Sequence, residues 1–188
     1  MVRHKSLGNS WNFSPIGVFV ANWLVIVSSV LLCVVMSLVR LPGMHLVGIG
    51  PNWLLIWVVA WSVNRTPLQG ILAGLVLGLI QDGMTAFEPT HAFSLATVGF
   101  LTARLQKHRY IQEDFISVAL ITFGMAVVSE TIMALQFSLQ GDRYLLEIWT
   151  NQQQVVVASA ILSSLWSPIV SYPLNRWWNY VKTLRQLT

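Results

Sequence analysis

The sequence predicts an all-α integral membrane protein, a bundle of six transmembrane helices. Of its 188 residues, 55% are hydrophobic and only 10% are charged, and the apolar residues gather in long runs. Soluble domains carry roughly 25% charged residues. A soluble chain with this composition would therefore expose large apolar patches to water. The composition argues against a soluble enzyme, a disordered chain and, with a single cysteine, a disulfide-bonded scaffold.

Six spans fill the chain as one domain over residues 1–188, because a membrane-spanning helix needs about 20 apolar residues. The first run follows the basic residues Arg3 and Lys5 and exceeds the 7–15 residues of a signal-peptide core, which predicts an uncleaved span. The second run is short for a span, and its start in the Gly- and Pro-rich segment 41–52 is poorly defined. The expected spans are residues 16–39, 49–63, 67–82, 90–105, 115–139 and 153–174.

Turn-forming and charged residues set the later boundaries. Pro67 suits the first turn of the third span, where its missing N–H costs nothing, and Asp82-Gly83 ends that span. The charged segment 104–114 separates the fourth and fifth spans, and the polar segment 141–151 separates the fifth and sixth.

The basic residues predict the orientation, because cytoplasmic loops of membrane proteins carry an excess of Lys and Arg. With both termini in the cytoplasm, nine basic residues lie inside and two lie outside. Those inside are Arg3, Lys5, Arg65, Arg104, Lys107, Arg109, Arg176, Lys182 and Arg185; those outside are Arg40 and Arg143. We therefore expect an N-in, C-in topology.

The third expected span carries a stripe of glycines. Gly70, Gly74 and Gly78 are four residues apart, so they share one helix face, with Asp82 next in step. Such a face lets another helix backbone approach closely. It can pack inside the bundle or dock another subunit. We expect Asp82 to stay hydrated, to cap a turn, or to pair with Arg40 or Arg143.

Two further groups are candidate sites. Glu130 is an acid well inside the fifth span, where burial of a charge is costly, so it is expected to face the bundle interior as a packing hydrogen bond or as a proton or ligand site. Trp53, Trp57 and Trp61 also step by four along the second span. They form either a packing stripe or a wall that stacks a flat ligand.

Other chemistry is weakly indicated. Asp82, Glu88 and His91 could be assembled into a metal site, but their spacing fits no standard ligand pattern. The chain contains no H-E-x-x-H, G-x-S-x-G or P-loop motif. We therefore expect no enzymatic activity, no cofactor, no metal and no nucleic-acid partner.

Residues 51–101 resemble the family of bacterial rod shape-determining proteins called MreD. The stretch reads P-N-W-L-L-I-W, then R-T-P-L-Q-G-I-L-A-G-L-V-L-G-L-I-Q-D-G, then T-H-A-F-S-L-A-T-V-G-F-L. The positions that carry the resemblance are Pro51, Arg65, Pro67, Gly70, Gly74, Gly78, Asp82, His91 and Ala92.

The resemblance implies a scaffold of the rod complex, or elongasome, in the bacterial inner membrane. Its implied direct partner is MreC, a single-span protein. Its implied indirect partners are the MreB filament, the glycosyltransferase RodA and the transpeptidase that works with RodA. The glycine face, with Arg65 and Asp82 at its ends, is the candidate contact surface.

MreD-like folds are also similar to the substrate-binding subunits of energy-coupling-factor vitamin transporters. That likeness implies an alternative function, a small-molecule-binding subunit of a membrane transporter. In that case Trp53, Trp57, Trp61 and Glu130 would line the ligand pocket.

Overall fold

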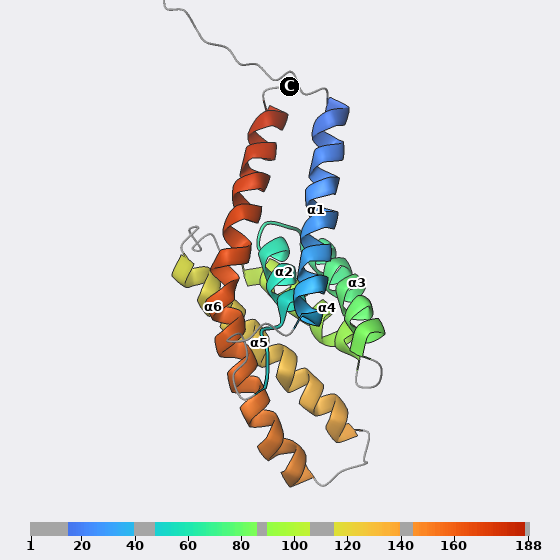
Figure 1. The fold of residues 1–188 in the computed structure, drawn as a ribbon, viewed down its shortest axis with the longest axis vertical. Coiled ribbons are helices and arrows are strands. Elements are labelled where there is room, and N and C mark those ends of the chain that lie inside the picture. Colours follow the sequence, from blue (N-terminus) through green and yellow to red (C-terminus); the bar gives the residue numbers. More distant parts are fainter. Residues whose placement is uncertain (1–14, 40–47, 86–89, 106–114, 140–144, 187–188) are drawn as a thin grey trace, which may run out of the picture.

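The computed structural model describes residues 15–39, 48–85, 90–105, 115–139 and 145–186. These residues form six helices (Figure 1): α1 (Pro15–Leu38), α2 (Trp53–Ser62), α3 (Pro67–Thr85), α4 (His91–Leu105), α5 (Phe115–Leu139) and α6 (Leu145–Gln186). Four of them, α1, α3, α5 and α6, are long and apolar enough to cross a membrane. The described residues therefore confirm the predicted all-helical class and four helices able to span a membrane.

Helix α2 lies at the centre of the bundle and packs against each of the other five helices. Nine of its ten residues are buried, Trp61 being the partly exposed one. At 1.5 Å per residue the helix is about 15 Å long, half the thickness of a bilayer's hydrocarbon core. A helix surrounded by protein has no polar face, which explains the continuous apolar run in its sequence.

The start of α2 differs from the expected residue 49. The helix begins at Trp53 because Asn52 caps it: the Asn52 side-chain oxygen accepts a hydrogen bond from the Leu55 N–H at 3.0 Å. The Asn52 N–H in turn donates to Ser163 Oγ of α6, also at 3.0 Å. The cap therefore fixes both the start of α2 and its position against α6.

Helices α3 and α4 form an antiparallel hairpin (Figure 1). Thr66 and Gln69 cap α3 reciprocally: the Thr66 N–H donates to Gln69 Oε1, and the Gln69 N–H donates to Thr66 Oγ1, each at 3.4 Å. Pro67 occupies the first turn, as the sequence predicts. The helix continues to Thr85, three residues past the expected end at Asp82.

Helices α5 and α6 form a second hairpin, in which Thr122 and Ser167 share a buried hydrogen bond of 2.5 Å. Helix α6 is 42 residues long and contains Pro168 and Pro173. It therefore exceeds the expected span 153–174 at both ends, and residues 145–151 are helical rather than a loop. Its length, about 63 Å at 1.5 Å per residue, is about twice the hydrocarbon thickness, so part of it must leave the membrane.

The first residues of α1 and the last residues of α6 lie at the same end of the molecule (Figure 1), which we call the terminal end. The turn between α2 and α3 approaches the second half of α6, where Asn64 Nδ2 donates to Asn175 Oδ1 at 3.3 Å. The end of α5 and the start of α6 lie at the opposite end of the molecule (Figure 1). Assignment of either end to the cytoplasm remains a prediction.

Candidate functional site

The three glycines of α3 lie directly against the backbone of α4. All three are buried, and a Cβ atom added at any of them would overlap α4 backbone atoms more closely than real Cβ contacts allow. The residues of α4 that it would meet are Gly99 for Gly70, Leu95 for Gly74 and Ala92 for Gly78. In this structure α4 therefore fills the glycine face, and a partner helix has no room there.

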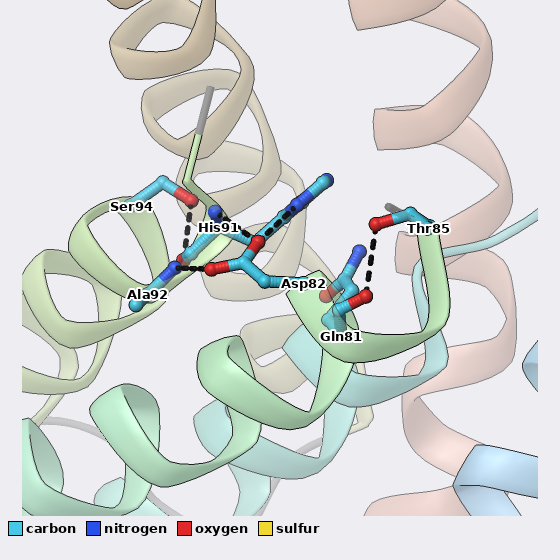
Figure 2. Close-up of polar contacts among 6 residues, drawn as sticks. All are labelled: Gln81, Asp82, Thr85, His91, Ala92 and Ser94. Atoms are coloured by element: carbon cyan, nitrogen blue, oxygen red, sulfur yellow. Dashed lines mark hydrogen bonds and ion pairs between the residues drawn. The ribbon is translucent and has the colours of Figure 1, made fainter. Parts of the chain in front are cut away.

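Asp82 caps the N-terminus of α4 (Figure 2). Its Oδ1 accepts the His91 backbone N–H at 2.6 Å, and its Oδ2 accepts the Ala92 N–H at 3.3 Å. Its Oδ1 also lies 2.8 Å from His91 Nδ1. The first N–H groups of a helix lack partners within that helix, and its N-terminus favours negative charge. Asp82 thus locks the end of α3 to the start of α4.

Of the groups considered for a metal site, Asp82 and His91 come together. Glu88 lies outside the described residues, as do Arg40 and Arg143, the cations considered as partners of Asp82. No group of three potential metal ligands occurs within the described part of the chain.

The tryptophan stripe of α2 is packed into the bundle. Trp53 contacts Trp166 of α6 with ring centroids 5.5 Å apart, and Trp57 stacks on Trp61 at 5.3 Å with an interplanar angle of 13°. The Trp57 indole N–H donates to Ser29 Oγ at 2.9 Å, which ties α1 to α2. These contacts satisfy the geometry that aromatic packing requires.

Arg65 lies at the terminal end of this stripe. Its guanidinium carbon is 4.2 Å from the centroid of the Trp61 ring, within cation–π range. Trp61 also contacts Trp178 of α6, edge-on, with the two ring centroids 5.1 Å apart. Arg65 therefore joins the turn between α2 and α3 to the aromatic core.

A cavity of about 470 Å³ lies between the end of α1, the segment before α2, and helices α3 to α6. Trp53 is the member of the tryptophan stripe among its described lining residues; Trp57 and Trp61 are not. The structure thus does not bring the whole stripe to this cavity, because the other two rings pack toward Ser29 and Trp178.

Glu130 lines this cavity together with Gln81, His91 and Ser159. Ser159 Oγ of α6 donates to Glu130 Oε1 at 3.3 Å. Gln81 Oε1 is buried and has no hydrogen-bond partner among the described atoms. A carboxyl group and a buried amide oxygen that line the same cavity can accept hydrogen bonds from a small polar molecule.

Gln81 and Ser159 are not singled out by the sequence. Gln81 precedes Asp82, whose charge draws attention first, and Ser159 is one of several small polar residues on α6. The hydrogen bond from Ser159 to Glu130 forms only because of how α6 is rotated about its axis relative to α5, and no local sequence pattern records that rotation.

Four of the packed helices are able to cross a membrane, which defines the class as a multi-pass membrane protein. Close contacts between helices hold the described part of its interior together. The family described as rod shape-determining protein MreD has a model that matches residues 18–175 of the 188-residue chain. The chain belongs to this family, whose members act in determining rod shape. The resemblance seen in residues 51–101 is thereby confirmed. Comparisons with curated proteins and with solved structures give no match.

Proposed function

We propose that the protein is a non-enzymatic membrane scaffold of the rod complex that binds MreC and supports peptidoglycan synthesis during cell elongation. The observation that carries this proposal is the family match over residues 18–175. The protein acts in the bacterial inner membrane, with both termini in the cytoplasm. MreB, RodA and its transpeptidase partner are reached indirectly, through the complex.

The fold supports a scaffold that separates its internal contacts from its external ones. The glycine face, the Asp82 cap and the tryptophan packing all lie between helices of this chain. The outer side of α1 and the side of α3 away from α4 carry exposed large apolar residues, among them Leu24, Leu31, Leu72 and Leu79. In a membrane such faces meet lipid or a partner span, so MreC docks on one of them rather than on the glycines.

Affinity purification of the tagged protein in mild detergent, with mass spectrometry of proteins and small molecules, tests the scaffold. We expect MreC in stoichiometric amount, accompanied by cell-wall synthases. Recovery of ATPase subunits, or of a stoichiometric small molecule without MreC, would contradict the proposal.

Photo-crosslinking then locates the MreC surface. A photoreactive residue is placed at Leu24 or Leu31 of α1, at Leu72 or Leu79 of α3, and at the fully buried Val58 as the control. Each exposed pair is seven residues apart, so its members share a helix face. We expect capture of MreC from one pair and none from Val58. Absence of capture from both pairs would exclude these two faces.

The second candidate function is the small-molecule-binding subunit of a transporter. The observation that favours it is the 470 Å³ cavity with Glu130, Gln81 and Ser159 in its wall. A bound ligand stabilises the folded protein by mass action. We expect a retained molecule, if this candidate is correct, to be lost in Glu130→Gln and kept in the neighbouring control Thr131→Val, whose hydroxyl bonds its own helix.

A further inference from the structure

A second cleft, of about 310 Å³, lies between the start of α5 and the second half of α6. Its lining residues include Phe115, Pro168, Ser171, Tyr172, Asn175 and Arg176. The hydrogen bond between Asn64 and Asn175 places it beside the turn between α2 and α3. It is separate from the Glu130 cavity, with which it shares no lining residue.

The polar side chains of this cleft include several hydrogen-bond donors. Ser171 is 2% exposed, and its hydroxyl has no hydrogen-bond partner among the described atoms. Arg176 Nη1 donates to Tyr172 Oη at 3.3 Å, which leaves the Tyr172 hydroxyl hydrogen to donate elsewhere. Asn175 Oδ1 accepts from Asn64, and the Asn175 NH₂ group supplies further donors.

Arg176 is the charged residue among the described residues that line the cleft. Glu113 and Asp114, which precede Phe115 in the sequence, lie outside the described residues. None of its described lining residues is acidic, and the ion pair found within the described residues lies elsewhere, between Asp82 and His91. A cation with several donors around it favours an anion with several acceptor oxygens, and Arg in particular suits phosphate. A buried hydroxyl without a partner costs free energy, which a bound acceptor recovers.

The apolar part of the cleft indicates where the phosphate comes from. Phe115, the first residue of α5, lies against Tyr172 with ring centroids 5.5 Å apart, and Pro168 continues the wall toward the middle of α6. Phe115 is 54% exposed and Tyr172 52% exposed. Donors beside exposed apolar rings, at the edge of a membrane-spanning hairpin, suit a headgroup that is attached to acyl chains.

We propose that this cleft binds the phosphodiester headgroup of an anionic phospholipid. Arg176 and the hydroxyls of Ser171 and Tyr172 bind the phosphate oxygens. Phe115 and Pro168 contact the glycerol and the first methylenes of the acyl chains. The bound lipid bridges α5 and α6 at the terminal end of their hairpin.

The test uses the full-length protein, delipidated in detergent and titrated with phosphatidylglycerol, phosphatidylcholine or inorganic phosphate, with native mass spectrometry and thermal unfolding as readouts. We expect the protein to retain phosphatidylglycerol and to be stabilised by it, and to be stabilised less by phosphatidylcholine. Arg176→Gln should lower the affinity for phosphatidylglycerol by about one order of magnitude, as for the loss of one charge-assisted hydrogen bond. The control is Lys182→Gln, an exposed cation on the same helix outside the cleft.

Ser171→Ala separates binding from folding. Removing an unpartnered buried hydroxyl should leave the lipid-free melting temperature unchanged or slightly raised, while phosphatidylglycerol affinity falls. Equal affinity of wild type, Arg176→Gln and Ser171→Ala would overturn the proposal. Stabilisation by inorganic phosphate without any by phosphatidylglycerol would overturn the lipid assignment and indicate a soluble phosphate compound.

Discussion

Replacing Gly74 by alanine adds one methyl group at the contact between α3 and α4. The new Cβ would lie 2.7 Å from the backbone nitrogen of Ala96 and closer still to the carbonyl of Leu95, whereas ordinary contacts begin near 3.4 Å. The atoms that it meets are backbone, so no side chain can rotate away. The two helices must therefore separate locally by at least about 0.7 Å, the difference between those two distances.

The expected cost follows from two opposing terms. Adding a methyl group to a packed interface costs about 1–3 kcal/mol, and the rigid backbone neighbours favour the upper half of that range. Alanine is about 1 kcal/mol better than glycine inside a helix, which offsets part of this cost. We expect Gly74→Ala to lower the free energy of unfolding by about 1–2 kcal/mol, or about 2–8 °C in melting temperature for a chain of this size.

The chain supplies matched controls. Gly83 of α3 and Gly124 of α5 are helical, and a Cβ at either would meet nothing within 4 Å. There only the propensity term acts, so alanine should leave the melting temperature unchanged or raise it. Thermal unfolding of the three variants in one detergent, followed by tryptophan fluorescence, measures the difference. If Gly74→Ala melts with Gly83→Ala and Gly124→Ala, the close contact between α3 and α4 is refuted.

Two other contacts are open to direct measurement. Asp82→Ala removes the acceptor of two N–H groups of α4 and should lower the free energy of unfolding by about 1 kcal/mol, as for other helix caps. Amide hydrogen exchange in the first turn of α4 should accelerate in Asp82→Ala but not in the control Thr85→Val. Equal exchange rates in the two variants would contradict the cap. Trp57→Phe and Ser29→Ala form a double-mutant cycle across the 2.9 Å bond between α2 and α1; we expect a coupling of about 0.5–1.5 kcal/mol, and a coupling of zero would show that this bond does not hold α1.

Several local features could be read from the sequence because their causes are local. The scarcity of charges and the apolar runs predict membrane helices, since backbone groups in lipid must be satisfied within each segment. Pro67 marks the start of α3 because proline acts within one turn. The spacing of the glycines places them on one face, and the resemblance of residues 51–101 identifies the family.

The lengths of the helices were harder to predict from the sequence. The ends of α6 differ from the prediction because a drop in hydrophobicity marks where a helix leaves the membrane, not where its hydrogen bonding stops. Proline does not end this helix, since neighbouring groups can compensate for the N–H that it lacks. Helix α2 begins at Trp53, after the Asn52 cap, and the Asn52 N–H also donates to Ser163, 111 residues away, a contact that no local pattern records.

The tertiary structure alone decides which apolar surface meets protein and which meets lipid. Lipid tails are as apolar as leucine, so hydrophobicity does not distinguish a core helix such as α2 from a peripheral one such as α1. That α4 fills the glycine face, that Asp82 caps α4, and that Ser159 reaches Glu130 all depend on how the helices are rotated against one another. The sequence alone determines that the chain is a membrane-embedded helical protein of the MreD family. The rotations decide which of its faces remain available to partners, because a helix contact joins residues that are far apart in the chain, as Asn52 and Ser163 are.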